Sequence, residues 1–267
     1  MKTIRDCVWL WGQTPGVHHE TVEWNLPGVN KMTPIEGCRY FGIENCFRVV
    51  MANKPAPPYD GEAEELKSLK NVVWSVVGDG GSDRTKTALG EINEVISLAS
   101  RFENITGGVL DDFFLPDRLA FYKPEHVRQI REKLHTEAKR ALDLWVVLYT
   151  NTLHMDLKPY LDECDVVSMW TWEGEALYHF DENFEKFKLQ TPGKRRALGL
   201  YMWNYGECKP LTEEQMEIQF DKYTRHLLNK DVEAIIICSN CTADIGLKAT
   251  EMTKAWLDRV GDTIIEE

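Results

Sequence analysis

The segment from Gly107 to Pro116 contains two adjacent acidic residues, Asp111 and Asp112, directly after an apolar stretch. Close carboxylates in an apolar setting raise one another's pKa, so one can stay protonated near pH 7 while the other is ionised. Glycoside hydrolysis typically uses one carboxylic acid as proton donor together with an ionised carboxylate. The structural alternative is that one aspartate caps the next helix and the other pairs with an arginine.

Tryptophans and polar residues close several other apolar segments of the chain. An indole ring stacks on the apolar face of a sugar, while carboxylates and amides bind the hydroxyl groups. A sugar site of this kind is predicted to use Trp11, Glu44, Asn45, Trp172, Trp203, Asn204 and Tyr205. The alternative is that the aromatic residues only fill the end of the core.

A second acid follows the sequence Trp170-Thr171-Trp172 at Glu173. We expect it to be the partner of the aspartate pair in catalysis. A separation of roughly 5 to 5.5 Å between the two carboxyl groups would suit retention, and roughly 6.5 to 9.5 Å would suit inversion. An acid in this position can also cap a helix or lie in a solvated loop.

These residues must be positioned by the elements that precede them. Eight short segments rich in Val, Ile, Leu or aromatic residues, each closed by a polar residue or glycine, are predicted to be buried strands. The predicted strands are Asp6–Gly12, Gly37–Asn45, Asn71–Gly78, Ile105–Asp112, Leu144–Asn151, Asp165–Glu173, Ala197–Gly206 and Ala234–Asn240.

Helical patterns lie between the strands and are clearest at Lys86–Arg101, Pro124–Ala141, Thr212–Leu228 and Leu247–Val260. Repeated strand and helix units imply parallel pairing, and the absence of a glycine-rich phosphate loop favours a closed barrel over a doubly wound sheet. The sequence therefore predicts the α/β class, with residues 1–267 forming a single (β/α)8 TIM barrel. In such a barrel the carboxyl ends of the strands meet at one mouth, where active sites lie.

The motif Leu110-Asp111-Asp112-Phe113-Phe114-Leu115-Pro116 resembles a pattern at strand four of glycoside-hydrolase barrels. It is also similar to the aspartate pair of N-acetylglucosaminidases that use substrate assistance. The resemblance implies that Asp111 orients an acetamido group and that Asp112 is the general acid. The Asn-Glu pair that retaining β-glycosidases of the large clan carry at strand four is missing.

Two other functions are compatible with the same residues. A metal-dependent sugar isomerase or epimerase would use oxygen and nitrogen ligands, and the candidates are Glu44, Asp79, Asp111, His154 and Glu173. No closely spaced ligand motif supports this alternative, and we expect neither a metal nor another cofactor. A barrel that binds carbohydrate without catalysis is the second alternative.

The composition restricts the partners and the compartment. The net charge is −12, from 43 acidic and 31 basic residues, and Lys and Arg form no cluster, so nucleic acid is not an expected partner. No apolar run is long enough to cross a bilayer, so no membrane partner is expected. Seven scattered cysteines fit reduced thiols in the cytoplasm. We therefore expect a cytoplasmic glycosidase that hydrolyses a small glycoside or oligosaccharide.

Overall fold

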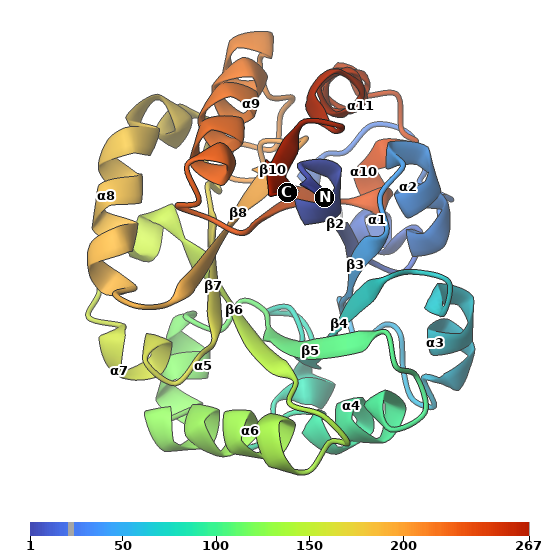
Figure 1. Ribbon diagram of the computed structural model, residues 1–267, viewed down its shortest axis with the longest axis vertical. Helices are drawn as coiled ribbons and strands as arrows, with labels where there is room; N and C mark the ends of the chain where they lie inside the picture. Colours follow the sequence, from blue (N-terminus) through green and yellow to red (C-terminus); the bar gives the residue numbers. More distant parts are fainter. Residues whose placement is uncertain (21–23, 267) are drawn as a thin grey trace.

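The computed structural model describes residues 1–20 and 24–266 and contains a closed barrel of eight parallel strands (Figure 1). The predicted α/β class and single (β/α)8 TIM barrel are confirmed. The barrel strands are β2 (Val8–Gly12), β3 (Asn45–Arg48), β4 (Asn71–Val77), β5 (Ile105–Leu110), β6 (Asp143–Tyr149), β7 (Val166–Trp170), β8 (Arg195–Tyr201) and β9 (Ala234–Cys238).

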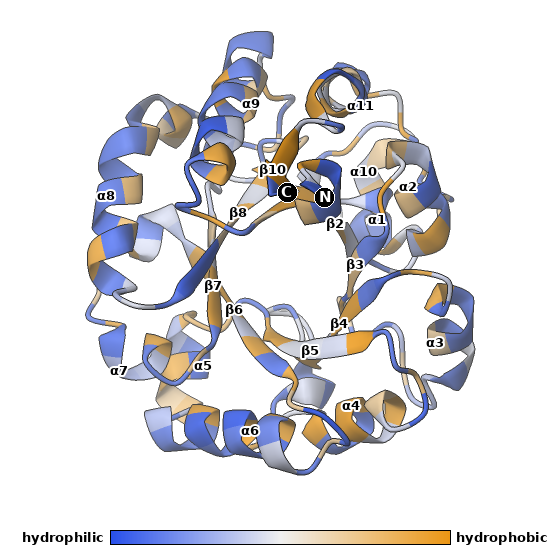
Figure 2. Cartoon of the chain, in the orientation of Figure 1, coloured by the Kyte–Doolittle hydropathy of each residue, from blue (hydrophilic) through white to orange (hydrophobic). Residues whose placement is uncertain are grey.

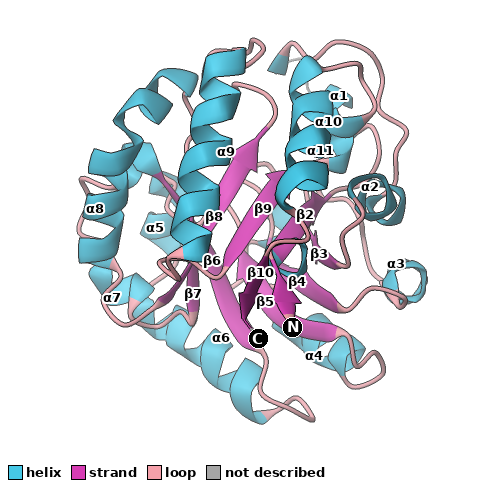
Figure 3. Cartoon of the chain, turned by 45° about the horizontal axis from the view of Figure 1, so that its top comes forward, coloured by secondary structure: helices cyan, strands magenta, loops and turns pink. Residues whose placement is uncertain are grey.

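Helices surround the strands on all sides (Figure 3). The longer ones turn polar faces outward, and the strands beneath them are mostly apolar (Figure 2). None of the helices in the described part of the chain is long and apolar enough to span a membrane. The helices are α1 (Val17–Glu20), α2 (Pro34–Phe41), α3 (Asp60–Leu66), α4 (Ile92–Ala99), α5 (Pro116–Phe121), α6 (Pro124–Thr136), α7 (Lys158–Leu161), α8 (Phe180–Gln190), α9 (Glu213–Leu228), α10 (Asn240–Ala243) and α11 (Lys248–Val260).

The second predicted strand was wrong, whereas the other seven predicted segments each overlap most of a barrel strand. Most of Gly37–Asn45 belongs to α2 and the turn after it, and β3 begins only at Asn45. The physical reason is a capping box, in which the side chains of Thr33 and Glu36 each bind the other residue's backbone N–H. This cap starts a helix where the apolar pattern alone indicated a strand.

The predicted helix Lys86–Arg101 is shorter than expected, because α4 begins only at Ile92. Gly90 adopts a φ of 54° directly before it and lies so close to strand β4 that an added Cβ would be 2.2 Å from the Val76 carbonyl oxygen. The close approach fixes a turn at this point. The backbone therefore becomes helical only after the glycine.

Aromatic side chains fill the inside of the barrel. Trp9, Phe47 and Trp145 contact one another toward the amino ends of the strands, with ring centroids 5.1 to 5.6 Å apart. Above them Trp11 contacts Trp170 edge to face at 5.2 Å. The barrel is therefore a packed core up to the level of the mouth.

Gly199 makes room for the largest of these rings. It pairs with Trp170 across the neighbouring strands β7 and β8, and an added Cβ would lie 1.9 Å from a ring carbon of that indole. The indole N–H donates to the hydroxyl of Ser168 at 2.9 Å. The missing side chain at position 199 thus lets a tryptophan lie flat across the barrel with its polar atom satisfied.

A short antiparallel pair lies outside the barrel sheet. β1 (Lys2–Thr3) pairs with β10 (Ile264–Glu266), and the two labelled termini lie side by side in Figure 1. Because β1 precedes β2, this pair marks the amino end of the strands. The carboxyl ends, where the sequence predicted the site, lie at the other face.

Candidate active site

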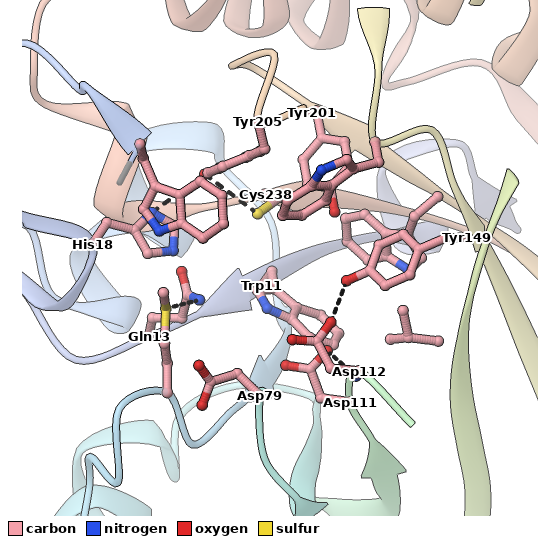
Figure 4. Close-up of a pocket in the computed structure, with 15 residues that line it drawn as sticks. Trp11, Gln13, His18, Asp79, Asp111, Asp112, Tyr149, Tyr201, Tyr205 and Cys238 are labelled. Carbon is pink, nitrogen blue, oxygen red and sulfur yellow. Dashed lines mark hydrogen bonds between the residues drawn. The ribbon is translucent and has the colours of Figure 1, made fainter. Parts of the chain in front are cut away.

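A pocket with a volume of about 90 Å³ lies at the carboxyl ends of the barrel strands (Figure 4). A space of this size holds several water molecules, roughly the bulk of one sugar ring. Its walls include the carboxylates Asp79, Asp111 and Asp112, the tryptophans Trp11, Trp24, Trp170 and Trp172, the tyrosines Tyr149, Tyr201 and Tyr205, and Gln13, His18 and Cys238.

The end of β5 places the aspartate pair. The backbone N–H of Asp111 still donates to the Val77 carbonyl of β4 at 3.0 Å, which holds this residue in line with the sheet. The next residue, Asp112, leaves the sheet with a φ of 44°. A left-handed backbone is uncommon for residues other than glycine and is best tolerated by Asn and Asp. This turn brings two successive carboxylates into the same pocket.

Asp112 is held by donors from two neighbouring strands. Its carboxylate accepts hydrogen bonds from the Gly80 N–H at 2.8 Å and from the Tyr149 hydroxyl at 2.6 Å. The backbone N–H of Asp112 donates to the carboxylate of Asp111 at 2.9 Å. Asp112 is half-buried, whereas Asp111 is only 6% exposed. A ligand that enters the pocket therefore contacts Asp112 before Asp111.

The electrostatic environment favours a proton on this pair. Burial raises the pKa of Asp111 well above its usual range, and the negative charges of Asp112 and Asp79 raise it further. The buried guanidinium of Arg118 opposes this rise only in part. Asp111 therefore retains its proton at a pH where an exposed aspartate has lost it.

Asp79, in the loop after β4, is the third carboxylate of the pocket. It accepts hydrogen bonds from the Ala52 N–H at 3.1 Å, the Gly81 N–H at 3.2 Å and the Ser82 hydroxyl. Burial raises the pKa of Asp79, and the hydrogen bond from Ser82 counteracts the effect. These donors fix the position of the carboxylate within the wall.

Neutral polar groups also line the pocket, and two of them, His18 and Gln13, lie on the left in Figure 4. Burial lowers the pKa of His18 to about 3, so its imidazole is neutral at pH 7, and it shares a hydrogen bond of 3.2 Å with the Tyr205 hydroxyl. Gln13 is 4% exposed, and its side-chain oxygen has no partner among the described residues. This oxygen can accept a hydrogen bond from a ligand.

Aromatic rings form the rim of the pocket. Trp172 stacks on Tyr205 with ring centroids 5.5 Å apart, and Trp24 meets both rings edge to face. The indole of Trp203 does not line the pocket. Instead its N–H donates to the backbone carbonyl of Trp24 at 3.0 Å and so positions that ring.

The structure brings together five of the predicted site residues: Asp111, Asp112, Trp11, Trp172 and Tyr205. They come from four different strand ends, as expected for a barrel mouth. Their common location was predicted from the positions of the strands alone. Their roles stay predictions.

Glu44 and Asn45 do not join this group, because the strand assigned to them was wrong. They lie at the start of β3, at the amino end of the barrel, in a surface hollow with Asp6 and Lys70. Glu44 is exposed, and Asn45 donates to the backbone carbonyls of Asp6 and Val8. Both residues therefore lie at the opposite end of the barrel from the pocket.

Glu173 and Asn204 also lie outside the pocket lining. Glu173 is exposed, precedes the short helix Gly174–His179 and packs against Gly206. Asn204 is buried, but its amide donates to the carboxylate of Glu207 at 2.6 Å. The chain turns away from the mouth after Trp172, and this turn removes the predicted second carboxylate from the site.

Several pocket residues were missing from the predicted site. Gln13, Asp79, Tyr149 and Cys238 each end a strand or follow it within two residues, so the rule that found the aspartates could have included them. His18 carries no such signal. It lies in α1, within the first strand-to-helix connection, and only the folded chain brings it to the pocket.

The proposed metal ligands are not brought together. Asp79 and Asp111 line the pocket, but His154 and Glu173 are exposed elsewhere and Glu44 lies at the other end of the barrel. Within residues 1–20 and 24–266, no group of three or more His, Cys, Asp and Glu residues is arranged to hold a metal ion. The pocket geometry therefore does not support that ligand set.

Comparison with solved structures finds barrels of similar fold. The catalytic domain of a hyperthermophilic chitinase from Pyrococcus furiosus is 12% identical with a TM-score of 0.57, and the match covers 97% of both chains. A GH113 beta-1,4-mannanase is 11% identical with a TM-score of 0.56, over 97% of this chain and 99% of that one. The shared feature is the fold.

Another neighbour has a different chemistry. A probable 2-pyrone-4,6-dicarboxylic acid hydrolase from Acinetobacter baumannii is 12% identical with a TM-score of 0.53, over 96% of this chain and 92% of that one. No family model and no curated protein matches the sequence. At such identities the likenesses show the fold alone, so function must be argued from the pocket.

Proposed function

We propose that the protein is a glycoside hydrolase that acts on a small glycoside or oligosaccharide by carboxylate general acid and base catalysis. The observation that carries the proposal is the pair Asp111 and Asp112, adjacent in a sugar-sized pocket with tryptophan and tyrosine walls. The chitinase and mannanase likenesses agree with it at the level of the fold. The partner is thus a carbohydrate.

In the proposed reaction Asp112 is the general acid, because it is the more accessible carboxyl group of the pair. It gives the proton to the glycosidic oxygen as the bond from that oxygen to the anomeric carbon breaks. Water supplies a hydroxyl group to the anomeric carbon and returns a proton to the carboxylates. Asp111 orients the sugar.

The sugar is held by residues on the remaining walls. Trp11, Trp172 and Tyr205 offer ring surfaces for stacking. Asp79 and the unpartnered oxygen of Gln13 accept hydrogen bonds from sugar hydroxyl groups. These two residues take the place that the sequence assigned to Glu44 and Asn45.

The test is hydrolysis of a panel of nitrophenyl glycosides, including N-acetylhexosaminides, with and without EDTA. We expect metal-independent turnover that falls about 10²-fold or more in Asp112→Asn. The matched control is Glu44→Gln, an exposed carboxylate at the other end of the barrel, which keeps full turnover. Full turnover in Asp112→Asn would exclude the assignment, and sugar binding without any turnover would indicate a carbohydrate-binding barrel.

We also propose that the protein works in the cytoplasm. Six of the seven cysteines, all except Cys208, are buried and form no disulfide within the part of the chain that the structure describes. Reduced, buried thiols are typical of a reducing compartment.

A further inference from the structure

A second cavity opens directly beside the sugar-sized pocket. It has a volume of about 540 Å³ and shares Trp24, Asp112, Tyr149 and Trp172 with the smaller pocket. Asp111 lines only the smaller one. The more accessible carboxylate of the pair therefore lies on the boundary between the two spaces. We call the larger space the outer groove.

The chemistry of the outer groove differs from that of the inner pocket. Beyond the shared residues its walls are Phe114, Leu115, Pro116 and Met155, with Asn151 and Thr152 as the polar contribution. Asp112 is the only charged residue among the described residues that line it. Leu115 is 36% exposed although it has a large apolar side chain. Such walls favour an apolar ligand over an anionic or a heavily hydroxylated one.

We infer that the outer groove binds the leaving group of the substrate and that this group is an apolar aryl or alkyl aglycone. The inference rests on the proposed glycoside hydrolysis, because it places the scissile bond at Asp112. With one sugar in the inner pocket, the bond to its aglycone crosses the boundary between the two spaces. The substrate class is then a monosaccharide joined to a hydrophobic alcohol or phenol.

The first experiment measures binding without hydrolysis. The probe is 2-phenylethanol, titrated against the intrinsic tryptophan fluorescence, to which Trp24 and Trp172 of the groove contribute, with glycerol as the polar comparison. We expect a saturable change with 2-phenylethanol alone, and a dissociation constant about 5-fold higher or more in Leu115→Asn. Asparagine suits position 115, since this residue is the N-cap of α5.

The matched control is Leu189→Asn, at an exposed leucine on α8 outside both cavities. It should bind the probe as the wild type does. An absent saturable response in the wild type, or equal affinity in the two leucine variants, would overturn the inference.

The second experiment measures hydrolysis of methyl, butyl and octyl glycosides of whichever sugar the panel identifies. Their leaving groups have similar acidity, so differences in kcat/KM report contacts with the alkyl chain. We expect the octyl glycoside to be hydrolysed about 10-fold or more faster than the methyl glycoside, with a smaller ratio in Leu115→Asn. A flat series overturns the inference while leaving the glycosidase assignment intact. Probe binding without hydrolysis of any glycoside removes the glycosidase assignment and keeps an apolar ligand for the groove.

Discussion

Buried side-chain amides at the two ends of the barrel differ in whether their oxygen atoms have a hydrogen-bond partner. At the amino end Asn45 donates to the carbonyls of Asp6 and Val8, and its oxygen accepts from the Asn71 amide at 2.8 Å. At the mouth Gln13 is also buried, yet its side-chain oxygen has no partner among the described residues. An unsatisfied buried acceptor costs about 1 to 3 kcal/mol. The fold explains the first amide, and a ligand bound in the pocket would explain the second.

The acids at the two ends differ in the same way. A hydrogen bond from the Thr3 backbone lowers the pKa of Asp6 at the amino end, so its ionised form supports the fold. Burial raises the pKa of Asp111 at the mouth, so its ionised form works against the fold. The comparison indicates that a buried polar side chain is a candidate functional group only where the surrounding chain does not stabilise it.

The strongest test of this comparison replaces an aspartate by asparagine at each end of the barrel. Asp111→Asn should lower kcat about 10²-fold or more, because the carboxyl group that orients the reacting sugar is lost. Asp6→Asn should leave kcat unchanged. Steady-state kinetics on the best nitrophenyl glycoside decide the matter, and comparable losses in the two variants would show that the ends are not functionally distinct.

Unfolding measurements on Asp111→Asn distinguish a loss of catalysis from damage to the fold. The raised pKa of Asp111 means that the stability it contributes is greatest below its unfolded-state pKa and is lost as the pH rises through the folded-state pKa. Asp111→Asn lacks this loss, so its urea midpoint near pH 7 should equal or exceed that of the wild type. A lower midpoint would point to structural damage.

His18 gives the next largest expected effect. Its pKa is lowered from 6.5 to about 3, so its contribution to stability is present above pH 6.5 and is lost as the pH falls toward 3. The slope reaches at most about 1.4 kcal/mol per pH unit. In His18→Gln, urea unfolding at pH 7, 5 and 4 should therefore show a flatter decline.

The matched control is His154→Gln, because His154 is an exposed histidine. Its acid profile should follow that of the wild type. If His18→Gln retains the full wild-type slope, other groups cause the acid sensitivity.

The smallest effect comes from replacing the two amides by apolar side chains. Asn45→Leu should lower the free energy of unfolding by about 1 to 3 kcal/mol, since three hydrogen bonds are broken in a buried place. Gln13→Met should change stability less and raise KM, since its oxygen is free for the ligand. Urea unfolding and kinetics of both variants provide the measurement, and a reversed order of stability losses would contradict the comparison.

The fold was predictable because alternating apolar segments and helices leave few arrangements other than a barrel. The failure at Gly37–Asn45 arose from a local signal, the capping box of Thr33 and Glu36, which outweighs an apolar pattern of strand type. A prediction that included this capping box would have placed Glu44 and Asn45 at the amino end of the barrel instead of at the mouth.

The site was predictable where a residue directly ends a strand, as at Asp111 and Asp112. The direction of the chain beyond a strand end was not, and Glu173 was misplaced for this reason. The sequence also does not reveal which hydrogen-bond partners a side chain has in the folded chain. Asn45 and Gln13 look equally suited to bind sugar, and only the contacts of the folded chain tell them apart.

The close fit of Gly199 against Trp170 has an evolutionary consequence. Any side chain at position 199 would occupy the volume of the indole, so the two positions should change together among descendants of this sequence. A lineage that gains a side chain at 199 must shrink the residue at 170, which lines the pocket floor. This single pair of positions then provides a route by which the barrel can acquire a deeper pocket and accept larger ligands.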